Sequence, residues 1–397
     1  MKKNIPLLII NSHPIQYFAP LYRQLAVDPA FDVTVLYCST HGLSGEVDHQ
    51  FGTSVQWDVP LLDGYKHEFL PNIAPNPSIH GFWGLINVAV IKHLWQAPKG
   101  IVIINGWASA VCLLTIFFAN LFGHKVCMRT DSSNLVEQRR SARQLRLRHW
   151  VLGRGLFRFI DHFLYIGEQN RAFYSFYDVP DHKLIYCPFA VDNDRFRQQY
   201  HMLKAQRREL RQRLGIAPNN HVVVFSGKYL PNKRPLDLLK AVHQLQRTDV
   251  SVVLLGEGIS RAELTSFVQQ HAMPNVLMTG FVNQSVIGQY YAAADIYVMC
   301  STVETWGLST NEAMNFGLPI VLSDTIGCVS DLVKEGVNGY SYPCGNVDQL
   351  AHRLAEIMAL STQERAMMGN ASLALVDEFS YTQTVQSLKA VLHPTSL

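Results

Sequence analysis

Residues Cys300 to Asp324 read CSTVETWGLSTNEAMNFGLPIVLSD, and this stretch predicts the fold of the half of the chain around it. The apolar residues 296–299 precede it, and its end, from Pro319, is apolar again. The pattern therefore predicts a strand, a loop, a helix and a second strand. Glu304 falls on the loop after the first strand, and Glu312 falls in the first turns of the helix. Open α/β sheets bind ligands at such strand ends, so we expect the functional site here.

The composition is that of a globular protein with two domains of ordinary size. The chain has 397 residues, of which 48% are hydrophobic and 16% charged, and a formal net charge of +3. So small a net charge does not indicate nucleic-acid binding. The seven cysteines are scattered and never in C-x-x-C spacing. This usage is typical of reduced thiols in a cytoplasmic protein without a disulfide framework or a zinc site.

Two apolar stretches raise the question of export or membrane insertion. The run before Asn11 is only about five residues long, shorter than the core of a signal peptide, so we interpret it as a first buried strand. Residues 101–123 contain no charged residue and are long enough to span a bilayer. Asn105 and Gly106 interrupt them, which favours a buried strand followed by a helix.

Short strands and helices are predicted to alternate along the chain, apart from a loop-rich segment at 41–77. The alternation predicts an α/β fold with two Rossmann-like domains that face an interdomain cleft. The predicted strands are 7–11, 33–38, 101–105, 125–129, 163–166, 184–187, 222–227, 251–255, 276–279, 296–299 and 319–322. The predicted helices are one that ends near 27, then 82–95, 108–122, 168–177, 235–247, 262–271 and 286–293, and further helices from 347 onward.

The two halves are predicted to be separate domains, because a polar, basic stretch without a strand pattern lies between them. We predict an N-terminal Rossmann-like domain over residues 1–191 and a linker over 192–220. A C-terminal Rossmann-like domain follows over 221–372. The last helix, 373–397, is expected to pack back on the N-terminal domain.

One segment of the first half is strongly basic. Arg139 to Arg158 contains seven arginines and no acidic residue, interleaved with leucines and aromatic residues. The pattern predicts an amphipathic helix, and two interpretations of it stay open. It is either the solvated face of a packed helix or a surface attracted to an anionic membrane, where each basic residue contributes about 1 kcal/mol. No recognition motif supports nucleic acid as its partner.

Three segments of the second half follow predicted strands and should lie together at one edge of the sheet. They are Gly227-Lys228 with Lys233 and Arg234, the turn Gly256-Glu257-Gly258, and the stretch from Glu304 to Glu312. Cations, a glycine turn and a helix amino end near residues 308–310 suit a diphosphate. Glu312 can accept hydrogen bonds from the two hydroxyls of a ribose, and Glu304 can do the same for a sugar. Taken alone, each feature is more often structural than functional.

The stretch from Glu304 through Glu312 to Val321 resembles the E-x7-E signature of the family 4 retaining glycosyltransferases, which have the GT-B fold. Most of the second half is similar to that family. The similar elements are Gly227-Lys228 through Lys233 (G-R/K-x4-K), Gly256-Glu257-Gly258 (G-x-G), Gly280 with Tyr290 to Ser301, and Phe189-Ala-Val-Asp192. In the first half, His13-Pro14-Ile15-Gln16-Tyr17 replaces the glycine-rich loop of the family. No histidine of this sequence matches the histidine in the catalytic region of the family. Trp107 and Arg129 fall near the place where that histidine would be.

The resemblance implies a role for each of these residues. Lys228 and Lys233 would hold the donor diphosphate, Glu312 the ribose and Glu304 the donor sugar. The donor-binding residues would be Gly227, Lys228, Lys233, Gly256, Glu257, Gly258, Glu304, Trp306, Gly307, Leu308, Ser309 and Glu312. The catalytic residues would be Glu304, Lys228, Lys233 and His13. For His13, capping of the helix that follows it is an equal alternative.

The implied activity is transfer of a sugar from a nucleotide-sugar donor to a glycan or polyprenyl-linked glycan acceptor, with retention, in cell-surface polysaccharide biosynthesis. The N-terminal domain would bind the acceptor, and family frequency favours a UDP-linked donor. No metal or other cofactor is expected, because the lysines stabilise the departing diphosphate. The D-x-D match Asp192-Asn193-Asp194 is interpreted as a linker turn. The implied location is cytoplasmic, with peripheral attachment to the inner membrane if the basic segment binds it.

Three other functions stay open. A nucleotide-sugar epimerase or hydrolase of the same fold would use this site without an acceptor. A nonenzymatic binder would bind the nucleotide sugar and transfer nothing. An NAD-dependent oxidoreductase is suggested only by Gly256-Glu257-Gly258, which lacks the third glycine of the dinucleotide fingerprint and lies in the wrong half of the chain.

Overall fold

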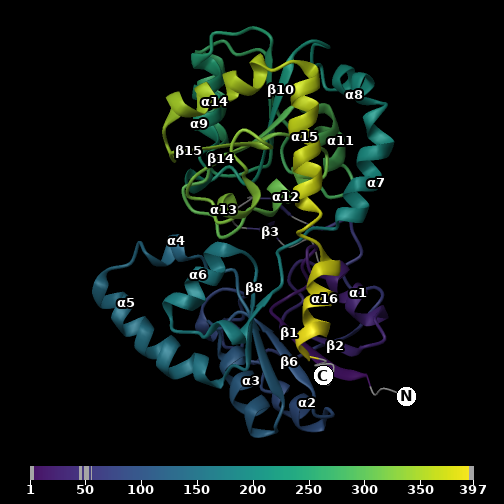
Figure 1. Cartoon of the computed structure of the whole chain (residues 1–397), viewed down its shortest axis with the longest axis vertical. Helices are drawn as coiled ribbons and strands as arrows, with labels where there is room; N and C mark the ends of the chain where they lie inside the picture. The colour runs from purple at the N-terminus through teal and green to yellow at the C-terminus, as the bar shows by residue number, and fades with distance from the viewer. Residues whose placement is uncertain (1–3, 44–46, 49–52, 55, 393–397) are drawn as a thin grey trace. The chain divides into compact units, whose positions relative to one another are not determined.

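The computed structural model describes residues 4–43, 47–48, 53–54 and 56–392. Outside this description lie residues 1–3, residues 44–46, 49–52 and 55 of the predicted loop segment, and residues 393–397 of the predicted last helix. The chain forms two compact units (Figure 1). The first takes its described residues from 4–43, 59–189 and 381–392, and the second takes its own from 47–58 and 190–380.

The first unit is built on a parallel sheet of seven strands in the order β5-β2-β1-β6-β7-β8-β9. Its central strands are apolar runs, as expected of a parallel sheet covered on both faces. Val102 and Ile104 on β6, for example, are fully buried. The strands are β1 (Ile5–Asn11), β2 (Phe31–Tyr37), β5 (Lys66–Phe69), β6 (Ile101–Asn105), β7 (Lys125–Arg129), β8 (His162–Tyr165) and β9 (Leu184–Tyr186).

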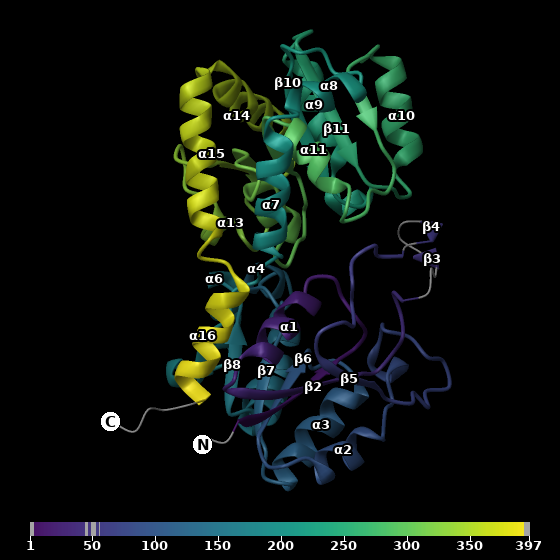
Figure 2. The same cartoon turned by 90° about the vertical axis from the view of Figure 1, so that its right-hand side faces the viewer.

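Helices cover this sheet, and one of them comes from the far end of the sequence. Helix α16 (Tyr381–Leu392) lies beside α1 (Ala19–Val27) in both views (Figures 1 and 2). The Lys389 ammonium is 3.0 Å from the Asp28 carboxylate, and the Tyr381 hydroxyl donates to the carbonyl of Tyr17. The other helices are α2 (Val90–Gln96), α3 (Ala110–Leu121), α4 (Asn134–Glu137), α5 (Ala142–Arg148) and α6 (Glu168–Phe176), with short turns η1 (Phe82–Gly84) and η4 (Asp181–Lys183).

The apolar stretch 101–123 forms strand β6 and helix α3, as predicted. Helix α3 buries Val111 and Ile116 in the core of the unit, whereas Phe117 and Leu121 are each 63% exposed. In the part of the chain that the structure describes, no helix has both the length and the apolar character needed to cross a membrane.

The second unit contains a parallel sheet of six strands in the order β12-β11-β10-β13-β14-β15. This is the 3-2-1-4-5-6 order of a Rossmann sheet. The order in which strands follow one another across the sheet reverses between β10 and β13, while the strands stay parallel. The strands are β10 (His221–Ser226), β11 (Val250–Leu255), β12 (Val276–Met278), β13 (Ile296–Met299), β14 (Ile320–Ser323) and β15 (Gly339–Tyr342), with a separate pair β3 (Val47–Asp48) and β4 (Thr53–Ser54). The two predicted Rossmann-like sheets are therefore confirmed.

Nine α-helices of the second unit lie among its described residues. They are α7 (Asn193–Lys204), α8 (Arg207–Arg213), α9 (Pro235–Gln244), α10 (Arg261–Gln270), α11 (Ile287–Ala293), α12 (Leu308–Met314), α13 (Val329–Leu332), α14 (Val347–Ala359) and α15 (Thr362–Val376), with the short turn η5 (Pro231–Lys233). Buried side chains of α9 and α14, among them Leu238 and Leu354, pack on the strands as one apolar core.

The segment 192–220, predicted as a linker, forms helices α7 and α8 within the second unit. Its basic side chains are attached to that unit. Arg207 and Arg211 each bind the carboxylate of Asp295 at 2.6 Å, and the Arg211 side chain also donates to backbone carbonyls. Polar composition here reflects arginines that tie helices to the unit by charge-assisted hydrogen bonds rather than a solvated connection.

The helix predicted over 82–95 is wrong in its first half. Only a short turn at Phe82–Gly84 and the helix α2 at Val90–Gln96 form. Between them Leu85 has an extended backbone. The side-chain amide of the buried Asn87 donates to the carbonyls of Cys38, Leu70 and Pro71. The amide thus satisfies backbone carbonyls of another segment, which holds this stretch out of a helix.

The basic segment is helical but not one uniform α-helix. Helix α5 begins with a capping box at Ser141 and Gln144, and it continues as a π-helical stretch η2 (His149–Leu156) and a short turn η3 (Phe157–Phe159). Gly153 lies where a Cβ atom would be 2.9 Å from the carbonyl oxygen of Tyr177. This close approach of α6 explains a glycine in the π-helical turn, since only glycine leaves that space free.

Candidate functional site

The three predicted segments lie together at the carboxyl ends of β10, β11 and β13. The Gly227 amide donates to Leu255, and the Tyr229 amide donates to Glu257, so the loops after β10 and β11 are bonded to each other. The Thr302 amide donates to the carbonyl of Asn232 over 2.7 Å, which attaches the loop after β13. The place is the switch point of the strand order, where open α/β sheets bind ligands.

Gly256 and Gly258 serve the packing of these loops. Gly256 has φ +145° and Gly258 has φ +154°, a region that disfavours other residues. A Cβ atom at Gly256 would lie 1.9 Å from the carbonyl oxygen of Gly227, and one at Gly258 would lie 2.5 Å from that of Tyr229. The space beside these glycines is thus filled by the backbone of the neighbouring loop. Between them, Glu257 binds Arg261 at 2.5 Å.

Lys233 and Glu304 form an ion pair across the site. Lys233 ends the short turn η5, and the following Arg234 adopts the left-handed conformation with φ 51°. Glu304 lies on the loop after β13, and its backbone carbonyl accepts from the Gly327 amide. Both side chains are about one-fifth exposed, so solvent and a ligand can reach them. Lys228 lies on the same loop as Lys233 and is partly buried.

Glu312 is 1% exposed and is held by two donors. The Gln284 side-chain amide donates to one carboxylate oxygen over 3.1 Å, and the Tyr291 hydroxyl donates to the other over 2.9 Å. Burial, and then the nearby Glu312 charge, hold the pKa of Tyr291 well above its ordinary value, so this phenol remains a donor. The carboxylate is therefore fixed in one orientation.

A second layer fixes Gln284 in turn. The Arg195 guanidinium, on α7, donates to the Gln284 side-chain oxygen over 2.7 Å and to its backbone carbonyl over 2.9 Å. The adjacent loop residues Asn283 and Ser285 are bound by Gln56 and Asp58 of the same unit. Sequence patterns did not point to Gln284 or Arg195. They are 89 residues apart and belong to no motif.

The residues from Trp306 to Ser309 shape the loop before α12. Trp306 is 2% exposed, packs against Phe379, and donates from its indole nitrogen to Asn311. Gly307, with φ +103°, starts the helix at Leu308. The Ser309 hydroxyl is paired with that of Tyr297 at 2.7 Å. Helix α12 has seven residues, and its first residue, Leu308, follows this loop directly.

His13 lies in the first unit, after β1. Its Nδ1 is 2.9 Å from the Ser12 hydroxyl, and its ring meets that of His41 edge-on. Burial, and then the neighbouring His41 and His80, lower the pKa of His13 to about 4, so the ring is neutral at pH 7. The suggested helix-capping role is wrong, because the N-cap of α1 is Phe18, with no side-chain cap.

The D-x-D match starts a helix. Asp192 is the N-cap of α7 and accepts from the Arg195 amide, while the Asn193 amide donates to the carbonyls of Val376 and Phe379. Among the described residues, no group of three or more His, Cys, Asp or Glu side chains is arranged to hold a metal ion. Asp192 and Asn193 thus have structural partners.

Two Rossmann-like units with these sheets define the GT-B fold. Residues 206–373 match the family model described as "Glycosyl transferases group 1". The chain is similar to "Uncharacterized glycosyltransferase MJ1607" of Methanocaldococcus jannaschii, with 27% identity over 43% of this chain and 44% of that one. It is also similar to "D-inositol 3-phosphate glycosyltransferase 2" of Catenulispora acidiphila, with 27% identity over 51% of each chain. The chain thus spans about half the length of the curated relatives it matches.

Similarity of structure extends over nearly the whole chain. The crystal structure of Anabaena Alr3699/HepE, in complex with UDP and glucose, covers 98% of this chain and is itself covered completely, with a TM-score of 0.73. The sequence identity in this comparison is 17%, so the similarity establishes the fold alone. The family match covers residues 206–373, all of which lie in the second unit.

Proposed function

We propose that this protein is a family 4 retaining glycosyltransferase that moves a hexosyl group from a nucleotide sugar to a glycan acceptor. One observation carries the proposal. Two lysines and two glutamates of the matched signature lie at the switch point of the second unit, with Lys233 and Glu304 paired and Glu312 fixed by Gln284 and Tyr291. Such a site offers cations for a diphosphate and carboxylates for hydroxyl groups.

Donor binding would exchange partners within the Lys233–Glu304 pair. The diphosphate would bind the Lys233 ammonium, with Lys228 beside it. The Glu304 carboxylate, released from Lys233, would accept hydrogen bonds from hydroxyl groups of the sugar. Negative charge grows on the diphosphate as the glycosidic bond breaks, so a fixed ammonium lowers the barrier. Two lysines supply this charge, and we propose that no metal ion or other cofactor is needed.

We propose UDP as the nucleotide. Support comes from the similar fold of the Anabaena protein, whose structure contains UDP and glucose. The proposal is tested by a thermal-shift panel of UDP, GDP, ADP and dTDP sugars. A ligand at a hundred times its Kd stabilises the folded state by about 2.7 kcal/mol, so the preferred nucleotide should stand out. A panel without any shift would contradict donor binding.

Transfer and its stereochemistry are tested with a labelled sugar donor. The expected result is label on an added glycan acceptor, with the anomeric configuration of the donor retained in the product by NMR. Turnover of donor alone would instead indicate an epimerase or a hydrolase, and binding without turnover would indicate a nonenzymatic binder. The oxidoreductase alternative is less favoured, because the loop backbone fills the space beside Gly256 and Gly258.

We further propose a polyprenyl-linked glycan acceptor of cell-surface polysaccharide biosynthesis, met at the cytoplasmic face of the inner membrane, with the N-terminal domain on the acceptor side. The basic segment supports this. Its exposed arginines stand beside exposed apolar side chains, namely Leu147 (63%), Trp150 (67%), Val151 (46%) and Phe159 (50%). Apolar groups beside cations are what an anionic lipid surface attracts.

The membrane proposal is tested by sedimentation with anionic vesicles. Replacing Arg143, Arg146 and Arg154 by glutamine should weaken sedimentation, because these residues are exposed. Arg148 is unsuitable for this test, since it binds the buried Glu137. The matched control replaces three exposed basic residues of the second unit, Arg208, Arg213 and Lys240. Equal sedimentation of both triple variants would contradict the proposal.

A further inference from the structure

Helix α3 is apolar on its outer face as well as on its inner face. Its 12 residues include no charged side chain. Val111 and Ile116 of the inner face are buried in the core of the first unit. Leu113, Phe117 and Leu121 are exposed. They recur at every fourth position, so they form one stripe along the outer face, where a surface helix of a globular protein normally carries polar side chains.

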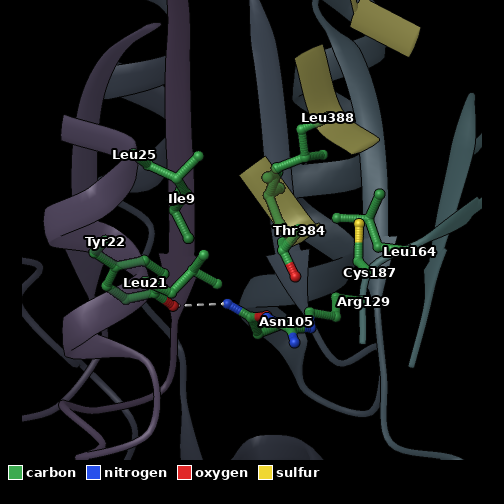
Figure 3. A pocket seen from close by; sticks show the side chains of 11 residues that line it. Ile9, Leu21, Tyr22, Leu25, Asn105, Arg129, Leu164, Cys187, Thr384 and Leu388 are labelled. Atoms are coloured by element: carbon green, nitrogen blue, oxygen red, sulfur yellow. Dashed lines mark hydrogen bonds between the residues drawn. The ribbon is translucent and has the colours of Figure 1, made fainter. Parts of the chain in front are cut away.

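Two other helices on the same sheet show the usual arrangement. Leu25 of α1 and Leu388 of α16 are buried, and they line one small cavity with Ile9 of β1 (Figure 3). The exposed residues of α16 include the polar Thr382 and Gln386. Both helices thus turn apolar side chains toward the sheet, and α16 turns polar ones toward water. The outer face of α3 departs from this rule, which indicates that something apolar covers it.

Neighbouring elements extend the stripe. The exposed Asn120 of α3 donates from its side-chain amide to the carbonyl of Phe159 over 3.0 Å, so the exposed Phe159 stands beside the helix. Helix α2 lies beside α3 in both views (Figures 1 and 2). The His124 ring, just after α3, donates to the carbonyl of Leu94 over 2.8 Å, and the next residue, Trp95, is exposed. We call the exposed apolar residues Trp95, Leu113, Phe117, Leu121 and Phe159 the α3 surface.

The charges around the α3 surface are positive. None of residues 69–130 and none of residues 138–160 is acidic. The exposed cations on the elements next to α3 are Lys92, Lys99, Lys125 and Arg158. The Arg158 guanidinium lies 5.5 Å from the ring centre of Phe159. Asp161, which follows the second of these segments, accepts from the amide of Val126 over 2.7 Å. An apolar surface bordered by cations complements an anionic lipid layer.

We propose that the α3 surface inserts into an anionic phospholipid bilayer, with Phe117 and Leu121 among the acyl chains and Trp95 at the level of the headgroups, where tryptophan is enriched. The inference rests on the membrane contact proposed above and not on sugar transfer. The basic segment would attract the protein to the lipid, and the α3 surface would hold it there. A second copy of the chain is a poorer occupant, because symmetric pairing would bring the bordering cations of two copies together.

Vesicle sedimentation at high salt separates insertion from attraction. At about 0.5 M sodium chloride the Debye length is only about 4 Å, so attraction between exposed charges is screened while apolar burial is not. Under these conditions Phe117→Gln with Leu121→Gln should weaken binding to anionic vesicles at least about tenfold, because two apolar side chains no longer leave water. The control, Ile259→Gln with Met367→Gln, changes two exposed apolar residues of the second unit and should bind like the wild type. Equal binding of the two double variants would refute insertion.

Brominated lipids report insertion without a change to α3. Bromine on the acyl chains quenches tryptophan only on close approach, so such vesicles should quench part of the wild-type fluorescence. Trp95→Phe should reduce the quenched fraction, whereas Trp57→Phe in the second unit should not. A quenched fraction that is zero, or that Trp95→Phe leaves unchanged, would overturn the proposal.

Sedimentation velocity without lipid tests the second copy as occupant. The wild type should sediment like the variant with Phe117→Gln and Leu121→Gln. A dimer that this variant abolishes would show that another chain covers the α3 surface, against the proposal. If the triple arginine variant loses binding at low salt while the α3 variant binds like the wild type at high salt, insertion is wrong and the proposed membrane contact stands.

Discussion

At the scale of single residues, the proposed donor site depends on how its carboxylates are held. Glu304 shares an ion pair with Lys233 and is within reach of solvent, whereas Glu312 is buried between Gln284 and Tyr291. The two glutamates of the signature thus differ in kind. One can change partners when a ligand arrives, and the other is preorganised.

Lys233→Ala should lower the rate of transfer about ten- to a hundredfold, because a charge-assisted bond to the diphosphate contributes about 1.5 to 3 kcal/mol. The fold should survive, since Lys233 is partly exposed. Initial rates at saturating acceptor, with circular dichroism as a check on folding, give the measurement. Lys240→Ala, an exposed lysine on the neighbouring α9, is the control. An unchanged rate in Lys233→Ala would remove Lys233 from the site.

Glu312→Ala should lower transfer by a similar factor without unfolding the protein, because the ribose loses its acceptor. Gln284→Met tests positioning instead, since it keeps the side-chain length and removes the donor to Glu312. We expect a weaker affinity for UDP, measured by calorimetry, with kcat nearly unchanged. If Gln284→Met binds UDP like the wild type, the orientation of Glu312 does not depend on this bond.

Stability should fall as the pH drops from 6.5 to 4. Burial first, and then His41 and His80, lower the folded-state pKa of His13 to about 4, whereas the unfolded chain has the ordinary value of 6.5. Between these values the unfolded state binds the proton more tightly, so unfolding becomes easier as pH falls, by on the order of 1 to 3 kcal/mol. Urea unfolding of His13→Asn should show a flatter pH profile in this window. His182→Asn, an exposed histidine of the same unit, should keep the wild-type profile.

At the scale of elements, the basic segment is anchored by one buried carboxylate. Glu137 is 3% exposed, and it receives Arg148 at 2.5 Å, Arg140 at 3.1 Å and the Tyr177 hydroxyl at 2.6 Å. Burial alone would raise the pKa of Glu137, but the hydrogen bonds from Arg148 and Tyr177 outweigh it and lower the pKa. Two of the seven arginines are thus structural, and the rest define the exposed surface.

Glu137→Gln should destabilise the first unit by about 2 to 4 kcal/mol, because it leaves a partly buried arginine without its counter-charge. Urea unfolding followed by tryptophan fluorescence would measure this, with Glu263→Gln on the exposed face of α10 as the control. A loss no larger than that of the control would mean that Arg148 finds solvent instead. The basic surface would then be less rigid than the contacts imply.

At the scale of the whole molecule, the alternation of apolar runs with helices predicted both parallel sheets, although strand β15 of the second sheet was not among the predicted strands. The loops that carry the glutamates and lysines were also predicted to lie together, because each follows a strand, and the structure brings them together. Their role in donor binding stays a prediction. Gln284 and Arg195 could not be predicted, since a hydrogen bond between residues far apart leaves no pattern in the sequence. Helices α7 and α8 were missed for a related reason. Arg195 of α7 binds Gln284 and the arginines of α8 bind Asp295, and composition alone cannot distinguish such bonds from solvation.

The first unit is closed by α16, the last helix described, although its sheet begins with the first described residues. During synthesis, chains fold from the amino terminus as they emerge from the ribosome. The first unit must therefore wait for α16 while the second unit, encoded between its parts, is completed. Until α16 has been synthesised, the apolar residues that pack around Leu388 lack its cover, and during this interval a chaperone would have a surface to bind.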